Sequence, residues 1–259
     1  MLRAESVSFG YGRGFTLTDA SVVITSGSVT GLLGPNGCGK TTLLRLLCGV
    51  LRPQAGRVML GDRLITSMAR REVARHVAVV PQETHPAFEY TVLEMVLMGR
   101  HPHLSTFQLE GPADLAIADE ALAATGTRHL AARSYMTLSG GEKQRVVIAS
   151  ALTQATDILL LDEPTASLDI GYQLEIASLL ARLNAERKMT MVLATHDLNL
   201  AASLCERLIV MREGRLLAAG TTQAVLTGET VRRLYGVEAD VHFHPRAGHL
   251  TVVPIRRAT

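Results

Sequence analysis

The sequence has 259 residues, a length that suits one large α/β domain or a domain with an inserted subdomain. Hydrophobic residues make up 47% of it, which is enough for a full core. The formal net charge of +2, with no basic run, argues against a dedicated nucleic-acid-binding protein.

The compartment is indicated by the cysteines and by the start of the chain. Cys38, Cys48 and Cys205 show no paired spacing, which favours a reducing compartment. The first residues lack the apolar core of a signal peptide. The uncharged stretch Ala20–Gly39 has a membrane-sized length, but its Ser, Thr, Gly, Asn and Pro content indicates strands and loops. We therefore expect a soluble, cytoplasmic protein.

The chain begins with two loosely alternating stretches, Leu2–Phe9 and Phe15–Ile24, separated by glycines. This pattern predicts antiparallel strands joined by a glycine-rich turn. Tyr11 lies in that turn, where an aromatic ring could stack on a nucleotide base. Taken alone, this residue is better read as a surface tyrosine.

The most informative stretch is GPNGCGKTT, which fits the phosphate-loop pattern G-x-x-x-x-G-K-[ST]. An apolar strand, 28–33, precedes it and an apolar helix, 43–48, follows it. The candidate nucleotide-binding residues in this loop are Gly34, Pro35, Asn36, Gly37, Cys38, Gly39, Lys40, Thr41 and Thr42.

The residue types in this loop suit a triphosphate. Glycines allow the tight curl through which backbone N–H groups cradle phosphates, and the helix N-terminus adds donors and a positive dipole end. We expect Lys40 to reach the β and γ phosphates, Thr41 to coordinate Mg²⁺ and Thr42 to contact phosphate. The alternative is a glycine-rich turn without a ligand.

The next segment contains a turn and strand at 53–60, a short charged helix at 67–75 and a buried strand at 76–81. Gln82 directly follows that strand. A glutamine at this position could ligate Mg²⁺ or position a water molecule, although alone it is weak support for a site.

From Thr91 to about Thr153 the spacing of apolar residues becomes helical, with expected helices at 92–98 and 115–125. This predicts a helical insertion. His101 and His103 in its loop have the spacing of a metal-binding pair, but no third ligand is near in sequence. Solvated loop histidines are the favoured interpretation.

A second candidate anion site begins with the sequence LSGGE and leads into an expected helix at 143–153. Its residues are Leu138, Ser139, Gly140, Gly141 and Glu142. One triphosphate does not need two such helix starts from the same molecule.

The run Asp157–Asp162 contains four consecutive apolar residues and predicts a fully buried parallel strand. Open α/β sheets bind ligands at the carboxyl ends of their strands. We therefore expect Asp162 to hold Mg²⁺ and Glu163 to accept a proton from, or orient, an attacking water. Two solvated carboxylates at a strand end are the alternative.

After a loop containing Asp169, the pattern predicts an amphipathic helix at 173–187 and a buried strand at 189–194. His196 follows that strand and could contact the γ-phosphate and hold Glu163 and water in register.

The C-terminal part is expected to form a strand hairpin at 208–218, a helix at 221–235 and a further hairpin from 241 to 254. His242, His244 and His249 in the last hairpin could form a metal site, but ordinary strand residues are favoured.

These motifs together resemble the ATP-binding cassette (ABC) family, and specifically the ATPase subunit of a transporter. The resemblance implies an α/β fold: a P-loop NTPase (RecA-like) core with an N-terminal antiparallel β subdomain and an inserted α-helical subdomain. It implies one ATPase domain over 1–259. Its predicted parts are a nucleotide-binding core at 1–86 and 154–235, a helical subdomain at 87–153 and a tail hairpin at 236–259.

The resemblance also assigns roles. Tyr11 becomes the residue that stacks on the base, Gln82 links Mg²⁺ and water to the transmembrane partner, and Asp169 belongs to the D-loop. Two copies pack head to tail, so that each ATP lies between Lys40 of one copy and the signature segment, Leu138–Glu142, of the other.

A finer resemblance links Leu97–Pro102, Leu168–Glu175 and Thr195–Ala201 to the importer group for iron–siderophore complexes, haem and cobalamin. Cys38 and Ser150 depart from the common pattern, but neither removes a catalytic group. The resemblance implies a homodimer at the cytoplasmic face of the inner membrane, two permease subunits, a substrate-binding protein as an indirect partner and no nucleic acid.

Three alternatives stay open: another import or export system, a non-transport ABC protein, and a catalytically dead cassette. Non-transport members usually carry two cassettes or long coiled coils, which this chain lacks. The cargo cannot be read from the sequence.

Overall fold

The computed structural model describes residues 1–12 and 14–258, and the chain divides into two units. One unit comprises Met1–Met68 and the chain from Leu183 onward, and the other comprises Ala69–Arg182. The predicted subdomain boundaries near residues 86, 153 and 235 stay predictions.

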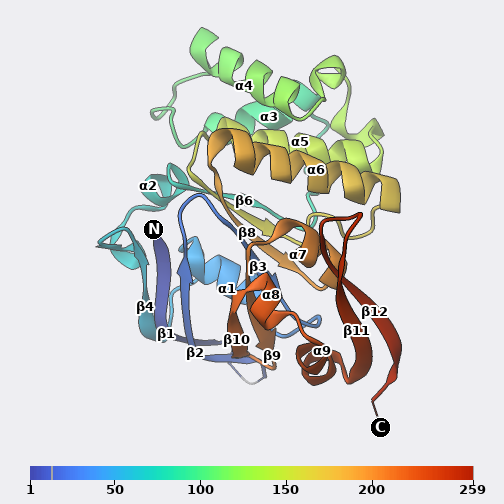
Figure 1. Cartoon of the computed structure of the whole chain (residues 1–259). Helices are drawn as coiled ribbons and strands as arrows, with labels where there is room; N and C mark the ends of the chain where they lie inside the picture. The colour runs from blue at the N-terminus through green and yellow to red at the C-terminus, as the bar shows by residue number, and fades with distance from the viewer. Residues whose placement is uncertain (13, 259) are drawn as a thin grey trace. The chain divides into compact units, whose positions relative to one another are not determined.

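The first unit contains an antiparallel sheet of order β2-β1-β4-β5 (Figure 1). Its strands are β1 (Leu2–Gly10), β2 (Thr16–Ile24), β4 (Ala55–Leu60) and β5 (Arg63–Leu64). The pairing of β1 with β2 confirms the predicted N-terminal hairpin.

The same unit contains four neighbouring strands in the order β10-β9-β3-β8. They are β3 (Val29–Leu33), β8 (Thr190–Thr195), β9 (Arg207–Arg212) and β10 (Arg215–Thr221). β3 pairs in parallel with both β8 and β9, and β9 and β10 form the predicted hairpin. Every residue of β3 and β8 is buried, which is typical of strands covered on both faces.

The helices of this unit differ in part from the sequence prediction. They are α1 (Lys40–Leu47), α7 (Leu198–Leu204), α8 (Thr222–Val225) and α9 (Gly228–Tyr235), with a 3₁₀ turn at Ile65–Ser67. The single helix predicted over 221–235 is wrong, because it breaks at Leu226 and Thr227. The Thr227 side chain accepts a hydrogen bond from the Thr230 N–H and so caps a new helix.

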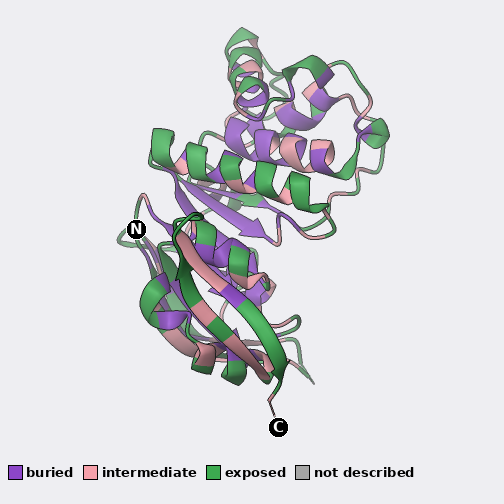
Figure 2. Cartoon of the chain, turned by 45° about the vertical axis from the view of Figure 1, so that its right-hand side comes forward, coloured by how far each residue is buried: buried purple, intermediate pink, exposed green. Residues whose placement is uncertain are grey.

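The C-terminal hairpin consists of β11 (Val237–His244) and β12 (His249–Arg257). It extends beyond the stretch 241–254 expected from the strand pattern and lies within the predicted tail at 236–259. Most of its residues are exposed or half-buried (Figure 2). The Asn199 side chain of α7 forms two hydrogen bonds to the backbone of Val252, at 2.8 and 3.3 Å. These bonds attach the hairpin to α7.

The second unit is mainly helical. Its helices are α2 (Arg70–Ala74), α3 (Val92–Leu97), α4 (Pro112–Ala124), α5 (Gly140–Thr153) and most of α6 (Ile170–Arg187). Short 3₁₀ turns lie at Met98–Arg100, Arg128–Leu130 and Tyr135–Thr137. α3 and α4 pack against α5 (Figure 1), and each of the three helices carries a buried apolar side chain: Val96, Leu122 and Ile148. A fully buried side chain of this kind contributes about 2 kcal/mol.

Two parallel strands, β6 (Val77–Val80) and β7 (Ile158–Asp162), complete the second unit. All five residues of β7 are buried, as predicted, whereas Val79 in β6 is exposed. The predicted helix at 67–75 is shorter than expected, since α2 begins only at Arg70. Among the described residues, none of the helices has both the length and the apolar character needed to cross a lipid bilayer.

Candidate functional site

The phosphate-loop candidate lies between β3, which ends at Leu33, and α1, which begins at Lys40. Gly37 and Gly39 have φ of 78° and 109°, a conformation that disfavours any residue with a Cβ. A Cβ at Gly34 would lie 2.3 Å from the carbonyl oxygen of Met211. The predicted strand, glycine loop and helix are therefore all present, and the glycines are required by geometry.

The Lys40 side chain folds back over the phosphate loop that precedes it. Its Nζ donates hydrogen bonds to the carbonyl oxygens of Gly34 at 2.8 Å and Pro35 at 3.3 Å, and the residue is only 5% exposed. Thr41 is half-buried and Thr42 is buried in the first turn of α1. A buried ammonium at a helix N-terminus gives this loop a strongly positive character, which suits a phosphate.

Two contacts that support the loop were missed by sequence reasoning. A Cβ at Gly39 would lie 2.5 Å from Cζ of the Phe15 ring, so the ring packs directly on this glycine. The Gly214 N–H donates a hydrogen bond to the Cys38 carbonyl at 3.0 Å. Both partners are distant in sequence, and neither belongs to a motif, so no local signal could have indicated them.

Tyr11 is 53% exposed, and its ring meets that of Phe9 edge-on, with centroids 4.9 Å apart. The free face of an exposed ring can stack on a base. The role of Tyr11 in base stacking stays a prediction.

His196 follows β8 directly. β3 and β8 run in parallel with Leu33 opposite Thr195, so the phosphate loop and His196 leave the same edge of this sheet. The Asp197 side chain accepts from the N–H groups of Asn199 and Leu200 and so caps α7. The His196 carbonyl accepts a hydrogen bond from the Tyr235 hydroxyl at 3.2 Å, a contact that the sequence did not indicate.

In the second unit, Gln82 comes two residues after β6, and Asp162 is the last residue of the adjacent parallel strand β7. Val80 of β6 is paired with Leu161 of β7, so these residues leave the same edge of the strand pair. Asp162 is buried and Gln82 is exposed. Glu163 has φ of 47°, in the left-handed region where a residue with a side chain is strained, and such strain is common at functional sites.

The second anion site is the N-terminus of α5, which begins at Gly140 rather than at the predicted Lys143. Ser139 and Glu142 form a capping box: the Ser139 hydroxyl accepts from the Glu142 N–H at 3.3 Å, and Glu142 accepts from the Ser139 N–H at 2.8 Å. These bonds from the Ser139 backbone and side chain hold the pKa of Glu142 below its usual range.

The remaining signature and D-loop residues are also placed. Leu138 is buried, Gly140 is exposed and Gly141 is buried. Asp169 is exposed, and its carbonyl accepts the Gln173 N–H at 2.9 Å in the first turn of α6.

Four of the five histidines considered as metal ligands have side-chain contacts with protein groups: His103, His242, His244 and His249. His103 hydrogen-bonds to the Gln154 carbonyl at 2.8 Å, and His242 lies 3.2 Å from the Asp240 carboxylate. His244 and His249 are paired at the tip of the C-terminal hairpin. Within residues 1–12 and 14–258, no group of three or more His, Cys, Asp or Glu side chains is arranged to hold a metal ion.

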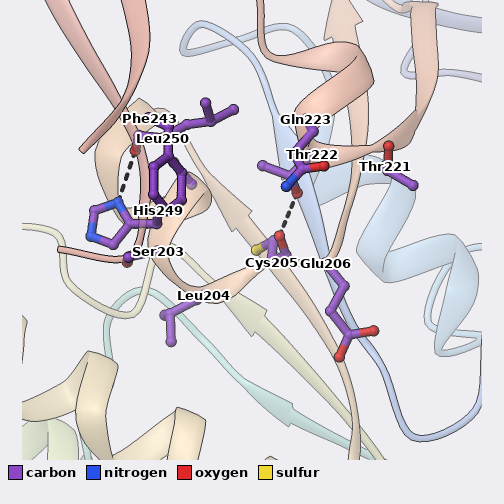
Figure 3. Close-up of a pocket in the computed structure, with 12 residues that line it drawn as sticks. Ser203, Leu204, Cys205, Glu206, Thr221, Thr222, Gln223, Phe243, His249 and Leu250 are labelled. Carbon is purple, nitrogen blue, oxygen red and sulfur yellow. Dashed lines mark hydrogen bonds between the residues drawn. The ribbon is translucent and has the colours of Figure 1, made fainter. Parts of the chain in front are cut away.

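A cavity of about 430 Å³ lies outside the predicted site, between the C-terminal end of α7, the start of α8 and the C-terminal hairpin (Figure 3). Thr222 donates to the Cys205 carbonyl at its base. Burial raises the pKa of the Cys205 thiol to about 12, so this group stays protonated and unreactive at neutral pH.

Comparison with known proteins decides the family. The sequence profile described as ABC transporter matches residues 17–166, which is more than half of the chain. The chain belongs to the ABC transporter family. Its fold is the P-loop NTPase fold of the ABC ATPases, as the solved structures below show.

Curated relatives of this ABC chain match it over nearly its full length. It is 41% identical over 256 residues to the ferric enterobactin transport ATP-binding protein FepC of Escherichia coli, covering 99% of this chain and 94% of the relative. It is 42% identical to the hemin import ATP-binding protein HmuV of Myxococcus xanthus, covering 99% and 98%. The match to the cobalamin import ATP-binding protein BtuD of Halobacterium salinarum is 41% and covers 92% of this chain but only 60% of that relative.

Solved ABC structures agree with the fold. One chain, described as part of a metal-chelate type ABC transporter in an inward-facing conformation, superposes with a TM-score of 0.87 at 31% identity, covering 98% of this chain and 96% of the other. A dimeric ATP-binding cassette bound to ADP and phosphate gives a TM-score of 0.73 at 27% identity, covering 86% and 99%.

Proposed function

We propose that this chain is the ATP-hydrolysing subunit of an importer that drives uptake of a metal chelate: an iron(III)–siderophore complex, haem or cobalamin. The observation that carries the proposal is the loop between β3 and α1, in which Lys40 is buried against two glycine-loop carbonyls. Support for the cargo class comes from relatives of 41% and 42% identity that are named for ferric enterobactin transport and hemin import.

The oxygen ligands that the chain offers suit Mg²⁺. The Thr41 hydroxyl, the Asp162 carboxylate and the Gln82 amide oxygen are hard ligands of the kind that Mg²⁺ takes. We propose that these three residues hold the ion that accompanies ATP. The ion would neutralise charge on the transferred phosphoryl group.

The chemical step is assigned to two residues. Glu163 accepts the proton of the attacking water or orients that water, and its backbone has the kind of strain that is common at functional sites. His196 contacts the γ-phosphate from the end of β8, where the Tyr235 hydroxyl and the Asp197 cap hold the adjoining backbone. Each group acts by position, since phosphoryl transfer needs mostly alignment and electrostatic stabilisation.

The second anion site gives the reason for a homodimer. The start of α5 offers the Ser139 hydroxyl and helix N–H groups to a phosphate, and we propose that this phosphate belongs to ATP held by Lys40 of a second copy. A related cassette has been solved as a dimer. The dimer would sit at the cytoplasmic face of the membrane against two permease subunits, supplied with cargo by a binding protein.

The catalytic assignment is tested by Glu163→Gln. Because the amide cannot accept the proton, we expect turnover to fall about a hundredfold or more while ATP still binds and closed dimers accumulate. Steady-state phosphate release and size-exclusion chromatography with ATP measure the two effects. Glu186→Gln, an exposed residue near the end of α6, makes the same charge change and should act as wild type. Near-normal turnover in Glu163→Gln would remove Glu163 from this role.

The cargo is tested in membranes with the complete transporter. ATP hydrolysis by the complex reconstituted with its permease is measured with binding proteins loaded with ferric siderophore, haem or cobalamin. We expect one of the three to stimulate hydrolysis. Stimulation only by an amino-acid-loaded or phosphate-loaded binding protein would assign the chain to a different import system.

A further inference from the structure

The first turn of α5, which carries the signature glycines, is covered by the beginning of α6. A Cβ at Gly141 would lie 2.4, 2.7 and 2.9 Å from Cδ1, Cγ and Cε1 of Tyr172. The Tyr172 ring therefore lies directly against the backbone of Gly141, and only glycine leaves room for it. The contact uses ring carbons and not the hydroxyl.

The neighbouring glycine, Gly140, is approached by a side chain from the same segment but stays exposed. Leu168 Cδ2 lies 3.4 Å from the position that a Cβ of Gly140 would take. The Gln173 side chain donates to the Leu168 carbonyl at 3.0 Å, which fixes the loop from which Leu168 projects. We name Leu168–Gln173 the α6 entry segment. Its Tyr172 side chain packs on Gly141, and its Leu168 side chain lies near the exposed Gly140.

The α6 entry segment is itself anchored. Its backbone enters α6 with the Gln173 N–H bonded to the Asp169 carbonyl. Two residues later, Glu175 of α6 pairs with Arg145 of α5. α5 and α6 lie alongside one another at this point (Figure 1). The ring of Tyr172 is thus held between an anchored helix and the start of α5, although the residue is 36% exposed.

We propose that Tyr172 is a positioning residue for the second anion site. Helix ends fray, and an anion site made of a helix N-terminus works only while its first turn is formed. The capping box of Ser139 and Glu142 holds this turn from one side, and the Tyr172 ring holds it through Gly141. The inference rests on the proposed function, because the anion is taken to be ATP bound by a second copy.

The same contact links the second anion site to the loop that carries Glu163. Thr165 and Leu168 lie in that loop, and the Gln173 side chain is directed at the Leu168 carbonyl while Tyr172, its neighbour, is directed at Gly141. Adjacent residues of one helix turn therefore contact the two segments. Tyr172 keeps the donors of the signature segment in register with the loop beyond Glu163.

The test compares Tyr172→Ala and Tyr172→Phe in the full chain. We expect Tyr172→Ala to lower kcat for ATP about tenfold or more, as loss of a preorganised donor does, because the first turn of α5 is no longer fixed. Nucleotide affinity of the single subunit, measured with a fluorescent ATP analogue at low protein concentration, should stay within about twofold, since Lys40 is untouched. Tyr172→Phe should keep kcat at the wild-type value, because phenylalanine retains the ring that makes the contact.

Two further measurements separate positioning from general damage. In the Glu163→Gln background, Tyr172→Ala should reduce the fraction of ATP-induced dimer seen by size exclusion. Phe107→Ala removes a ring that is 100% exposed in the same unit and should leave kcat and dimer formation unchanged. The melting temperature of Tyr172→Ala should stay close to that of the control.

Several outcomes would overturn the proposal. Wild-type kcat in Tyr172→Ala would show that the ring positions nothing. A parallel loss of nucleotide affinity or of melting temperature would show that it only stabilises the fold, and failure of Tyr172→Phe to restore kcat would move the role to the hydroxyl.

Ser139→Ala separates this inference from the proposed function. If Ser139→Ala abolishes turnover while Tyr172→Ala is normal, the proposed function stands and only the role of Tyr172 falls. If Ser139→Ala hydrolyses ATP like the wild type, both fall together.

Discussion

Lys40 shows how one residue joins structure and function in this chain. Its ammonium bonds to two loop carbonyls and is buried, so it is already desolvated where a phosphate would sit. A charge pair about 4 Å apart contributes about 4 kcal/mol at an effective dielectric of about 20. We predict that Lys40→Ala weakens ATP binding about a hundredfold or more, measured by titration with a fluorescent analogue. Arg45→Ala, on the exposed face of α1, removes the same charge and should bind normally. Equal affinities in both variants would exclude the role of Lys40.

Asp114 makes the stability of the helical unit depend on pH in the acid range. Its carboxylate accepts from the Gly111 N–H at 3.0 Å and from Arg100 at 2.9 Å, and Arg100 also donates to the Thr153 carbonyl. The Gly111 N–H, with Arg100 next, holds the pKa of Asp114 below its usual range. The unfolded chain therefore binds this proton more readily than the folded chain. The stability contributed is complete above the unfolded pKa of about 3.9 and is lost as pH falls through the lower folded pKa.

Asp114→Asn tests this acid dependence. We predict that it lowers the melting temperature by several degrees at neutral pH, because Arg100 is left buried without its carboxylate. The difference from wild type should shrink as pH falls below about 4, because the unfolded wild-type chain then takes up this proton, and it should be smallest below the lower folded pKa. Thermal unfolding followed by circular dichroism across this range measures it. Asp119 lies on the same helix as Asp114 and forms an exposed ion pair with Arg128. Asp119→Asn breaks this pair and should change the melting temperature little at any pH. A pH-independent difference would contradict the assignment.

Among the elements, the C-terminal hairpin is hydrogen-bonded to α7 through one side chain. Asn199 of α7 donates to and accepts from the Val252 backbone, so its removal loses two hydrogen bonds at a partly buried position. We predict that Asn199→Ala speeds amide hydrogen exchange in 237–257 about tenfold while leaving 69–182 unchanged. Ser203→Ala, an exposed position of α7, is the matched control. Unchanged exchange in the hairpin would show that the strands hold themselves in place.

The elements also show what the sequence could predict. Strands β3, β7 and β8 were found from their apolar runs, and the phosphate loop from its glycines and its flanks, because these signals are local. The predicted start of α5 was three residues too late. The glycines of its first turn have low helix propensity, but the capping box more than compensates for this.

The contacts that hold the site were not predictable. The ring of Phe15 under Gly39, the ring of Tyr172 over Gly141 and the hydroxyl of Tyr235 on His196 each join segments that only the tertiary fold brings together. The motifs name the residues that touch phosphate, whereas their supports lie outside any motif. The role of each site residue accordingly rests on chemistry and geometry, and stays open to the tests given above.

At the scale of the whole molecule, the two candidate anion sites belong to different units: Lys40 to the first and Ser139 to the second. If each ATP is shared between two copies, Lys40→Ala and Ser139→Ala should both abolish turnover alone and yet complement each other when mixed. A mixed dimer has one site that joins the intact Lys40 of one subunit to the intact Ser139 of the other. Random pairing would then restore about a quarter of the wild-type sites.

The measurement is ATP hydrolysis after subunit exchange. Mixing Lys40→Ala with the Lys40→Ala/Ser139→Ala double variant supplies no intact site and is the control. Absence of recovery, with exchange verified by differently tagged subunits, would mean that both groups act on ATP within one chain.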